Sequence, residues 1–321
     1  MPSSIIERYP FVSVIIPTKN EEKNLTLCLD ALTKIDYPKH LYEIIVVDNG
    51  SVDKTIEIAK KYGVRIFEEP DKKISGLRNL GANESGGSIL AFIDADVIVD
   101  DKWLENAVNR LNNNNEIACA GSSPDIPVES TWVTKAKYLM VEARGENINT
   151  SRKWLTSMNL IIRKDIFFKM GGFNESLITC EDVDFGYRLT KKYQIYYDKK
   201  IRAVHLGEPR TLAELFKKEM WRGTSNFQGI RSHGLVLNEI KSLILPVYCF
   251  VTLLLFVFSF MAGFTNFIPY ILLLIIFPVL LKTSAVIYKT GKYNMFLKFF
   301  ICFSTYVLAR TAAVFLIFKR R

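Results

Sequence analysis

Two carboxylates separated by one residue are the strongest chemical signal in the sequence. Asp94-Ala95-Asp96 directly follows the apolar run Ser88–Ile93, which has the pattern of a buried strand. Such a pair can bind one hard divalent cation, Mg²⁺ or Mn²⁺, through oxygen ligands. The cation would neutralise a diphosphate leaving group, so the pair predicts a metal–diphosphate site. Asp-x-Asp alone is a weak motif, because such pairs are also common in loops and helix caps.

Buried strands that alternate with short helices must position these carboxylates. The apolar runs predict strands at 12–16, 43–47, 64–67 and 88–93, and helical patterns follow the first two of them. This alternation predicts an α/β domain with a mostly parallel sheet. Ligands bind at the carboxyl ends of such strands. The polar clusters of the sequence lie at those ends: Pro17–Glu21, Asp48–Ser51 and Asp94–Asp96.

Five short motifs follow one another along the chain: Val12–Glu21, Ile45–Ser51 with Asp53, Gly76–Gly81, Asp94–Asp96 and Glu181–Phe185. In this order they resemble the motifs of the family 2 glycosyltransferases. The resemblance covers about residues 10 to 205. It implies a GT-A (Rossmann-like) fold and an inverting transfer from a nucleotide-diphosphate sugar with a divalent metal. Each motif is short, but five of them in order make the resemblance specific.

The resemblance also implies roles for individual residues around the donor. Pro17, Thr18, Asn20 and Glu21 would touch the nucleotide, and Asp48 and Asn49 would read the base or ribose. The family often has a second Asp where this chain has Asn49, which leaves the base preference open. Gly76, Arg78 and Asn79 would contact the donor, although a helix start with a stabilising Arg is the alternative. Asp94, Ala95 and Asp96 would complete the donor site, with Asp94 and Asp96 as metal ligands.

The Glu181-Asp182 pair is the candidate for acid–base chemistry. An inverting transfer needs a base that takes the proton of the attacking acceptor hydroxyl, and the resemblance assigns this role to Asp182, beside Glu181. A competing interpretation is a capping box with Thr179 as N-cap and Asp182 at the third helical position. In related enzymes a His near position 205 can be a third metal ligand, and a neutral imidazole suits Mn²⁺. A His at a strand end can equally be hydrogen-bonded only.

The charge of the chain is divided unequally along its length. The 321 residues carry a net charge of +9. Residues 1–209 hold 28 Lys and Arg against 30 Asp and Glu, whereas residues 210–321 hold 14 against 3. The excess positive charge therefore lies in the most apolar third, which favours a membrane surface as partner over nucleic acid. Five scattered Cys residues without a CxxC pair favour a reducing compartment.

The last third has the pattern of a membrane region. Residues 242–281 contain no charge and are interrupted near Gly263–Pro269, which predicts spans at about 243–262 and 268–288. A third apolar stretch, 295–318, contains Arg310 and either crosses the membrane or lies in its interface. The expected domains are 1–209 for catalysis, 210–241 for amphipathic interfacial helices and 242–321 for two to three transmembrane helices. The positive-inside rule puts the catalytic domain on the cytoplasmic face of the cell membrane.

The leading hypothesis is a membrane-anchored, metal-dependent glycosyltransferase of cell-envelope glycan biosynthesis. The donor would be a UDP- or GDP-sugar, and the acceptor a polyprenyl-linked lipid or a surface glycan. The sequence is compatible with an oligomer. A non-catalytic nucleotide-sugar-binding scaffold or sensor is the alternative. A sugar-nucleotide pyrophosphorylase is disfavoured, because Pro17–Glu21 lacks the Gly-rich loop of those enzymes.

Overall fold

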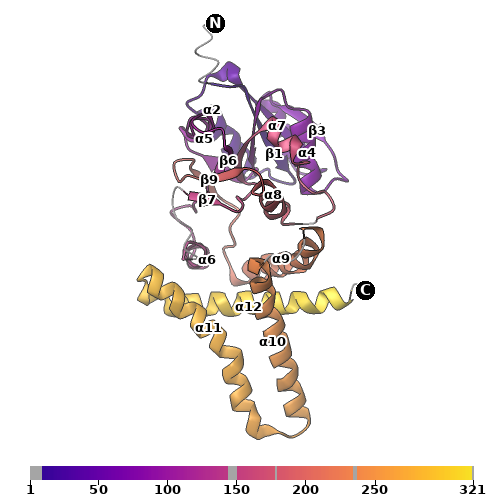
Figure 1. The fold of residues 1–321 in the computed structure, drawn as a ribbon, viewed down its shortest axis with the longest axis vertical. Coiled ribbons are helices and arrows are strands. Elements are labelled where there is room, and N and C mark those ends of the chain that lie inside the picture. The colour runs from indigo at the N-terminus through magenta and orange to yellow at the C-terminus, as the bar shows by residue number, and fades with distance from the viewer. Residues whose placement is uncertain (1–8, 144–149, 178, 234–236, 320–321) are drawn as a thin grey trace. The chain divides into compact units, whose positions relative to one another are not determined.

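The structure, a computed structural model, describes residues 9–143, 150–177, 179–233 and 237–319. The chain divides into two compact units (Figure 1). Unit 1 comprises 1–127 and 147–207, and unit 2 comprises 128–146 and 208–321. The segment 128–146, which falls within the first expected domain, thus groups with the C-terminal helices.

Unit 1 is built on a mixed, mostly parallel sheet. Among the described residues its strand order is β3-β2-β1-β4-β8-β6-β9-β7. The first four strands run parallel to one another, whereas β8 is antiparallel to both of its neighbours and β7 is antiparallel to β9. The α/β prediction is therefore confirmed. The strands are β1 Val12–Thr18, β2 Tyr42–Asp48, β3 Arg65–Glu68, β4 Ile89–Ile93, β6 Ile117–Gly121, β7 Thr150–Arg152, β8 Asn159–Arg163 and β9 Gln194–Tyr197.

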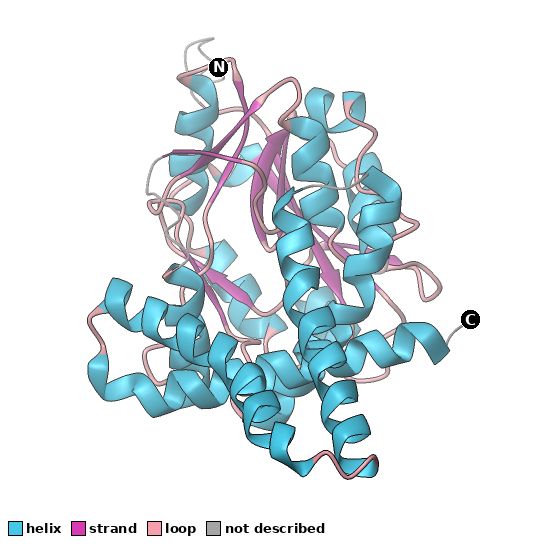
Figure 2. Cartoon of the chain, turned by 60° about the horizontal axis from the view of Figure 1, so that its bottom comes forward, coloured by secondary structure: helices cyan, strands magenta, loops and turns pink. Residues whose placement is uncertain are grey.

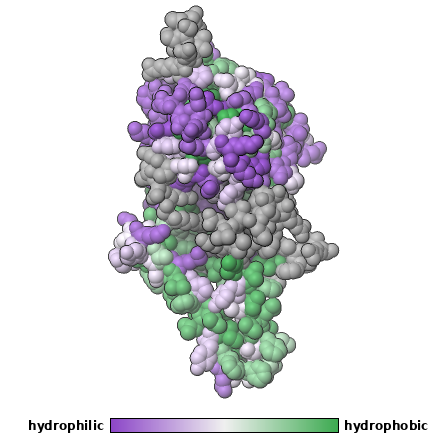
Figure 3. All heavy atoms as spheres, in the orientation of Figure 1, coloured by the Kyte–Doolittle hydropathy of each residue, from purple (hydrophilic) through white to green (hydrophobic). Residues whose placement is uncertain are grey.

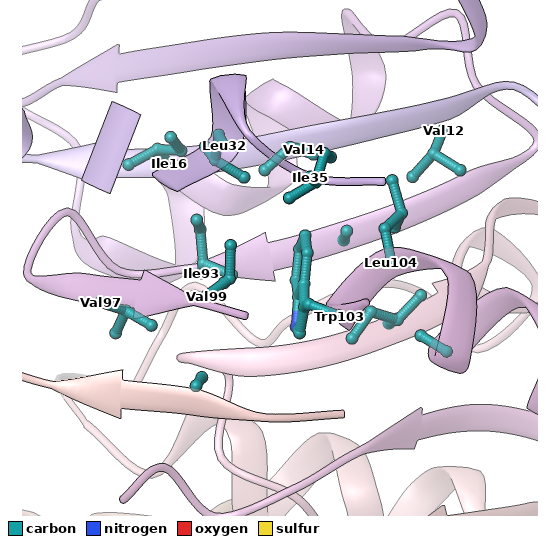
Figure 4. Packing of buried hydrophobic residues seen from close by; sticks show 14 of the residues in the cluster. Val12, Val14, Ile16, Leu32, Ile35, Ile93, Val97, Val99, Trp103 and Leu104 are labelled. Carbon is teal, nitrogen blue, oxygen red and sulfur yellow. The ribbon is translucent and has the colours of Figure 1, made fainter. Parts of the chain in front are cut away.

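Helices cover the sheet because its central strands are mostly apolar. Every residue of β1 and β4 is buried, as expected for parallel strands that pack on both faces. The indole of Trp103 is fully buried and lies between Val99 and Leu104 (Figure 4). The helices of unit 1 are α2 Leu25–Thr33, α3 Thr55–Lys61, α4 Ile74–Asn83, α5 Trp103–Asn112, α7 Lys164–Lys169 and α8 Glu181–Leu189.

A second, two-stranded sheet holds a distant residue beside the Asp94–Asp96 pair. Strand β5, Val97–Val99, follows the Asp94–Asp96 pair directly and is antiparallel to β10, Ala203–His205. The register places His205 opposite Val97. A residue more than a hundred positions further along the chain is thereby fixed beside the carboxylate pair.

Unit 2 is helical (Figure 2). Its helices are α6 Trp132–Glu142, α9 Leu212–His233, α10 Leu237–Met261, α11 Ile268–Thr290 and α12 Phe296–Lys319. Three segments are long and apolar enough to cross a membrane: Ile244–Met261, Thr265–Thr290 and Tyr293–Val314. Hydrophobic residues dominate the surface of α10 and α11 (Figure 3). The predicted interruption between the first two segments is confirmed by a turn at Gly263, where φ is 75°.

Candidate active site

The carboxyl ends of β1 and β2 are joined by side-chain hydrogen bonds. Thr18 and Asp48 are partners in the parallel register, and Thr18 Oγ1 donates to Asp48 Oδ2 at 3.1 Å. Asp48 is fully buried and also accepts from the backbone N–H of Ser51 at 2.7 Å. Asn20 continues the link, since its N–H donates to Ser51 Oγ at 2.8 Å. The structure thus brings two predicted clusters together and uses Asp48 to shape the turn after β2.

Glu21 lies near other carboxylates at the same edge of the sheet. Burial raises the pKa of Glu21, and the nearby Asp96 and Asp94 raise it further, although a hydrogen bond from Asn24 opposes the rise. Pro17, in contrast, is buried within β1. The crowding of Glu21, Asp94 and Asp96 leaves this edge of the sheet with a concentration of negative charge that a bound cation would offset.

The contacts of Asn49 account for the amide at a position where the family often has a second Asp. Its side-chain nitrogen shares its two N–H groups among three backbone carbonyls, those of Glu69, Pro70 and Lys72, at 2.9, 3.0 and 2.8 Å. A carboxylate at this position has no donor and would face three carbonyl oxygens. The amide therefore holds the turn after β3, and the role of Asn49 toward the base stays a prediction.

The predicted donor residues on α4 make contacts within unit 1. The Asn79 side chain donates to the Phe173 carbonyl at 2.8 Å and accepts from the Phe173 N–H at 2.9 Å. Gly76 is buried, and a Cβ at this position would lie 3.1 Å from the Glu175 carboxylate. Helix α4 is thereby fixed to the loop that precedes α8.

Arg78 joins two carboxylates from distant parts of the sequence. One terminal nitrogen donates to Asp94 Oδ1 and the other to Glu181 Oε1, both at 2.6 Å. The guanidinium is almost fully buried, with 3% of the Arg78 side chain exposed, so in this structure it acts on protein carboxylates. Direct contact of Arg78 with a donor stays a prediction. The two ion pairs fix the predicted metal carboxylate relative to the predicted acid–base pair.

Asp182 has the electrostatic environment of a general base. Burial and the neighbouring Glu181 carboxylate raise the pKa of Asp182 to about 7, although Arg78 opposes the rise. Its Oδ1 accepts from the Val183 N–H at 2.8 Å, and its Oδ2 lies 3.4 Å from the Ser157 N–H. A carboxyl group with a pKa near neutrality can both accept and return a proton at physiological pH.

Asp96 and His205 are in direct contact. His205 Nε2 lies 3.1 Å from Asp96 Oδ2, and both side chains are largely buried. Gly207 lies against this pair, because a Cβ at this position would be 1.9 Å from Asp96 Oδ2 and 3.0 Å from His205 Nε2. Any side chain larger than hydrogen at Gly207 would therefore displace Asp96 or His205.

The side chains of Asp96 and His205 are of types that can bind a divalent cation. Carboxylate oxygens and an imidazole nitrogen are ligands that Mn²⁺ accepts, and Asp96 and His205 already converge. Within the described part of the chain no three His, Cys, Asp or Glu side chains are spaced to hold one metal ion together. Asp94 instead directs Oδ1 to Arg78. The structure brings Asp96 and His205 together. The full ligand set of Asp94, Asp96 and His205 stays a prediction.

One competing interpretation of the acid–base pair is wrong. Helix α8 begins at Glu181 with Cys180 at the N-cap in a left-handed conformation, at a φ of 64°. Asp182 therefore occupies the second helical position, and Thr179 does not cap the helix. Helix α8, labelled in Figure 1, belongs to unit 1, and its first turn carries Glu181 and Asp182.

Sequence reasoning missed two residues of the site. Ser157 contacts the acid–base pair through its backbone, as given above, and through its hydroxyl, which donates to Glu181 Oε1 at 3.4 Å. Gly207 leaves room for Asp96 and His205. Neither contact has a local signal, since each depends on a pairing of segments far apart in the sequence.

Comparison with known proteins decides the family. The sequence model described as Glycosyl transferase family 2 matches residues 13–175, about half of the chain. The chain is also 31% identical over 227 residues to Glycosyltransferase AglE of Haloferax volcanii, covering 68% of this chain and 74% of that protein. This chain belongs to glycosyl transferase family 2. It is therefore a glycosyltransferase, and the resemblance found from the five motifs is confirmed.

Two further proteins are similar to this family 2 glycosyltransferase. The first is a Methanococcus voltae enzyme named dolichyl N-acetyl-alpha-D-glucosaminyl phosphate 3-beta-D-2,3-diacetamido-2,3-dideoxy-beta-D-glucuronosyltransferase. It is 25% identical over 222 residues, and the match covers 60% of this chain and 65% of that protein. The second is the solved structure of mannosyltransferase PcManGT from Pyrobaculum calidifontis in complex with GDP-Man and Mn²⁺. It superposes with a TM-score of 0.64 at 17% identity, covering 97% of this chain and 88% of that one, and supports the GT-A-like fold.

We expect Asn49→Asp to lower the free energy of unfolding by about 1–2 kcal/mol, because three hydrogen bonds to carbonyls are lost. A thermal-unfolding series in detergent measures the effect. Asn113→Asp is the control, since Asn113 is exposed after α5. Equal midpoints for the two variants would contradict the structural role of the Asn49 amide.

We expect Arg78→Met to lower stability by about 3 kcal/mol, because two carboxylates lose their buried partner. Since Arg78 lowers the pKa of Asp182, its loss should also move the rise of the pH–rate profile to higher pH. Arg78→Lys should shift the profile in the same direction but less, because a single ammonium does not reproduce the two-armed contact. Arg65→Met, at an exposed ion pair, is the control, and an unshifted profile in both Arg78 variants would contradict the assignment.

Proposed function

We propose that this chain is an inverting, metal-dependent glycosyltransferase that moves a sugar from a UDP- or GDP-sugar to a membrane-associated acceptor. A polyprenyl-linked lipid or a surface glycan is the acceptor class. The observation that carries the proposal is the line of contacts from Asp94 through Arg78 to Glu181 and its neighbour Asp182. It links a carboxylate suited to a diphosphate-bound cation with a carboxyl group suited to proton transfer.

The donor side of the proposed site comprises Asp94, Asp96 and His205. These residues would hold Mg²⁺ or Mn²⁺, and the bound cation would supply positive charge that stabilises the leaving diphosphate. The contact between Asp96 and His205 and the negative charge around Glu21 support this assignment. The Pyrobaculum neighbour was solved with GDP-Man and Mn²⁺, which is consistent with such a donor.

The acceptor side of the proposed site is Asp182. As the acceptor oxygen attacks the anomeric carbon, its proton passes to the Asp182 carboxylate. The bond between the anomeric carbon and the diphosphate oxygen breaks, and its electron pair leaves with the nucleoside diphosphate. Attack from the face opposite the leaving group inverts the anomeric centre. Ser157 contacts both Asp182 and Glu181, while Arg78 balances the charge of Glu181.

The proposed acceptor class follows from the membrane character of unit 2. Three described segments could cross a bilayer, and the Methanococcus relative is named for a dolichyl-linked phosphate substrate. An acceptor whose attacking oxygen belongs to a phosphate is already anionic and needs no strong base. The dependence on Asp182 therefore distinguishes a hydroxyl acceptor from a phosphate acceptor.

We further propose a division of labour along the chain. Residues 1–209 carry catalysis, 210–241 lie at the membrane surface, and 242–321 anchor the enzyme. The 14 Lys and Arg residues after position 209 support a cytoplasmic location of the catalytic unit through the positive-inside rule.

We expect Asp182→Asn to reduce transfer to a hydroxyl acceptor by about 10²–10⁴-fold, the range for loss of a general base. Binding of the donor nucleotide should persist. In the wild type, kcat/KM should rise with pH and level off above about 7, because only the deprotonated carboxylate accepts a proton. Radiolabelled-sugar transfer into native membranes, with UDP- and GDP-sugars tested in parallel, measures both effects.

Asp165→Asn is the matched control for Asp182, because Asp165 is an exposed carboxylate in the same unit. Full activity of Asp182→Asn with hydroxyl acceptors would refute Asp182 as the base. Failure of every donor to give transfer or hydrolysis would refute the proposed donor class.

We expect Asp96→Ala to weaken Mn²⁺-dependent donor binding at least tenfold, which corresponds to about 1.4 kcal/mol. Calorimetric titration of the donor with Mn²⁺ and with a chelator measures this difference. Asp101→Ala is the control, since Asp101 is exposed at the start of α5. Donor affinity that is equal with and without the metal in the wild type would contradict the cation assignment.

A further inference from the structure

Helix α12 contains a buried ion pair in the middle of an apolar sequence. Arg310 Nε and one terminal nitrogen donate to Glu219 Oε2 of α9, at 3.0 and 2.8 Å. Only 11% of the Arg310 side chain and 6% of the Glu219 side chain are exposed. Glu219 also accepts from Arg222 at 3.1 Å. Composition alone makes the segment 293–314 a candidate membrane span, but Arg310, four residues before its end, is paired with a residue of the polar helix α9.

The contact between α9 and α12 is close at this point. A Cβ on Gly223 would lie 2.6 Å from Ala313 Cβ and 3.2 Å from Arg310 Cδ, so only glycine allows the two helices to approach this far. The described part of α9 carries exposed Glu214 and Lys217 and a half-exposed Trp221, a composition typical of the membrane interface. Residues 310–313 of α12 and the middle of α9 must therefore lie at the same depth.

Helix α6 adds a third element to this group. Lys137 of α6 forms an ion pair with Glu208 in which both side chains are largely buried. Burial and the nearby Arg222 lower the pKa of Lys137 to about 8, although Glu208 opposes the change. The apolar face of α12 packs on α6 in one cluster that includes Val133, Ala136, Met140, Phe299, Cys302 and Phe303. We call α6, α9 and α12 the surface layer.

Helices α10 and α11 have the opposite character. Their candidate spans are 22% and 28% buried, against 44% for that of α12. Large apolar side chains cover their outside, among them Leu254, Phe258, Leu273 and Phe277. Helix α12 runs across the pair rather than alongside it (Figure 1). Among the described side chains of unit 2, large exposed apolar ones are concentrated on α10 and α11, which gives these two helices the apolar surface that lipid tails require.

We propose that α12 lies in the headgroup region of the membrane with α6 and α9, and that only α10 and α11 cross the bilayer. The end of α12 then lies on the same side of the membrane as the turn at Gly291. An Arg–Glu pair held by polar helices is compatible with the interface, whereas in hydrocarbon it would carry a large desolvation cost. The arrangement also leaves Lys289, Lys292 and Lys319 on one side, in agreement with the positive-inside rule. None of this depends on the proposed reaction.

Epitope tags in the full-length chain test the number of crossings. One tag is placed after Gly263, one after Gly291 and one at the C-terminus, and antibody access is measured in sealed inside-out vesicles. We expect the tags after Gly291 and at the C-terminus to be accessible from the same face, and the tag after Gly263 from the opposite face. A C-terminal tag on the face of the Gly263 tag would overturn the proposal.

Depth measurements test the orientation of α12 without reference to its ends. A genetically encoded spin-labelled residue replaces Leu297 or Leu308, which are 66% and 63% exposed and lie eleven residues apart. Collision accessibility to oxygen and to a nickel complex then gives the depth of each label in phosphatidylcholine–phosphatidylglycerol vesicles. We expect nearly equal depths, whereas a spanning helix would separate the two positions by about 16 Å.

The same spacing on α10 provides the matched control. Ile244 and Leu255 are also eleven residues apart and exposed, and as part of a true span they should differ in depth by about 16 Å. A depth difference between Leu297 and Leu308 as large as that of the α10 pair would overturn the proposal. The measurement requires no enzymatic activity, so a failure of the proposed reaction would leave this result unaffected.

Discussion

The guanidinium of Arg78 is the constraint on which the catalytic unit depends. It lies almost fully buried between Asp94, at the end of β4, and Glu181, at the start of α8. A buried cation is tolerated only if its partners stay in place, and buried carboxylates likewise require their partner. The three groups therefore fix one another, and with them the spacing between strand end, helix α4 and helix α8.

The electrostatics of Asp182 follow from this arrangement. Burial and the charge of Glu181 raise its pKa, and the charge of Arg78 limits the rise. A change in either neighbour would alter the protonation of Asp182 at neutral pH. The same residue that holds the predicted metal carboxylate thus also adjusts the group suited to proton transfer, although it need not touch a substrate.

The buried charges of unit 2 are also held in ion pairs. Glu219 binds Arg310 and Arg222, and Lys137 binds Glu208, so each of these charges has a partner within the helical unit. The helices that carry these pairs form the surface layer, while α10 and α11 expose apolar side chains. The charges of the surface layer are paired, whereas residues 242–281, which make up most of α10 and the first part of α11, carry no charge. This difference supports the proposed interfacial position of the surface layer.

Much of the fold could be predicted from the sequence because its signals are local. Strands β1, β2 and β4 are largely apolar runs, and a motif at the carboxyl end follows each of these three strands directly. Parallel strands bring such ends to one edge of a sheet, so the sequence alone predicts that Thr18, Asp48 and Asp94 lie at the same edge. The membrane segments were equally visible, since their length and composition are properties of contiguous residues.

Only the tertiary structure decided what each polar side chain contacts. The sequence could name Arg78, Asn49 and His205 but not show that Arg78 pairs with Glu181, that Asn49 holds a turn, or that β10 carries His205 to Asp96. It could not tell whether Arg310 lies in lipid or against Glu219. By itself the sequence determined the elements, the family motifs and the amphipathic pattern, because these depend on neighbouring residues. The contacts Arg78–Glu181, Asp96–His205 and Arg310–Glu219 join residues 103, 109 and 91 positions apart, and only the packing of the folded chain selects such partners.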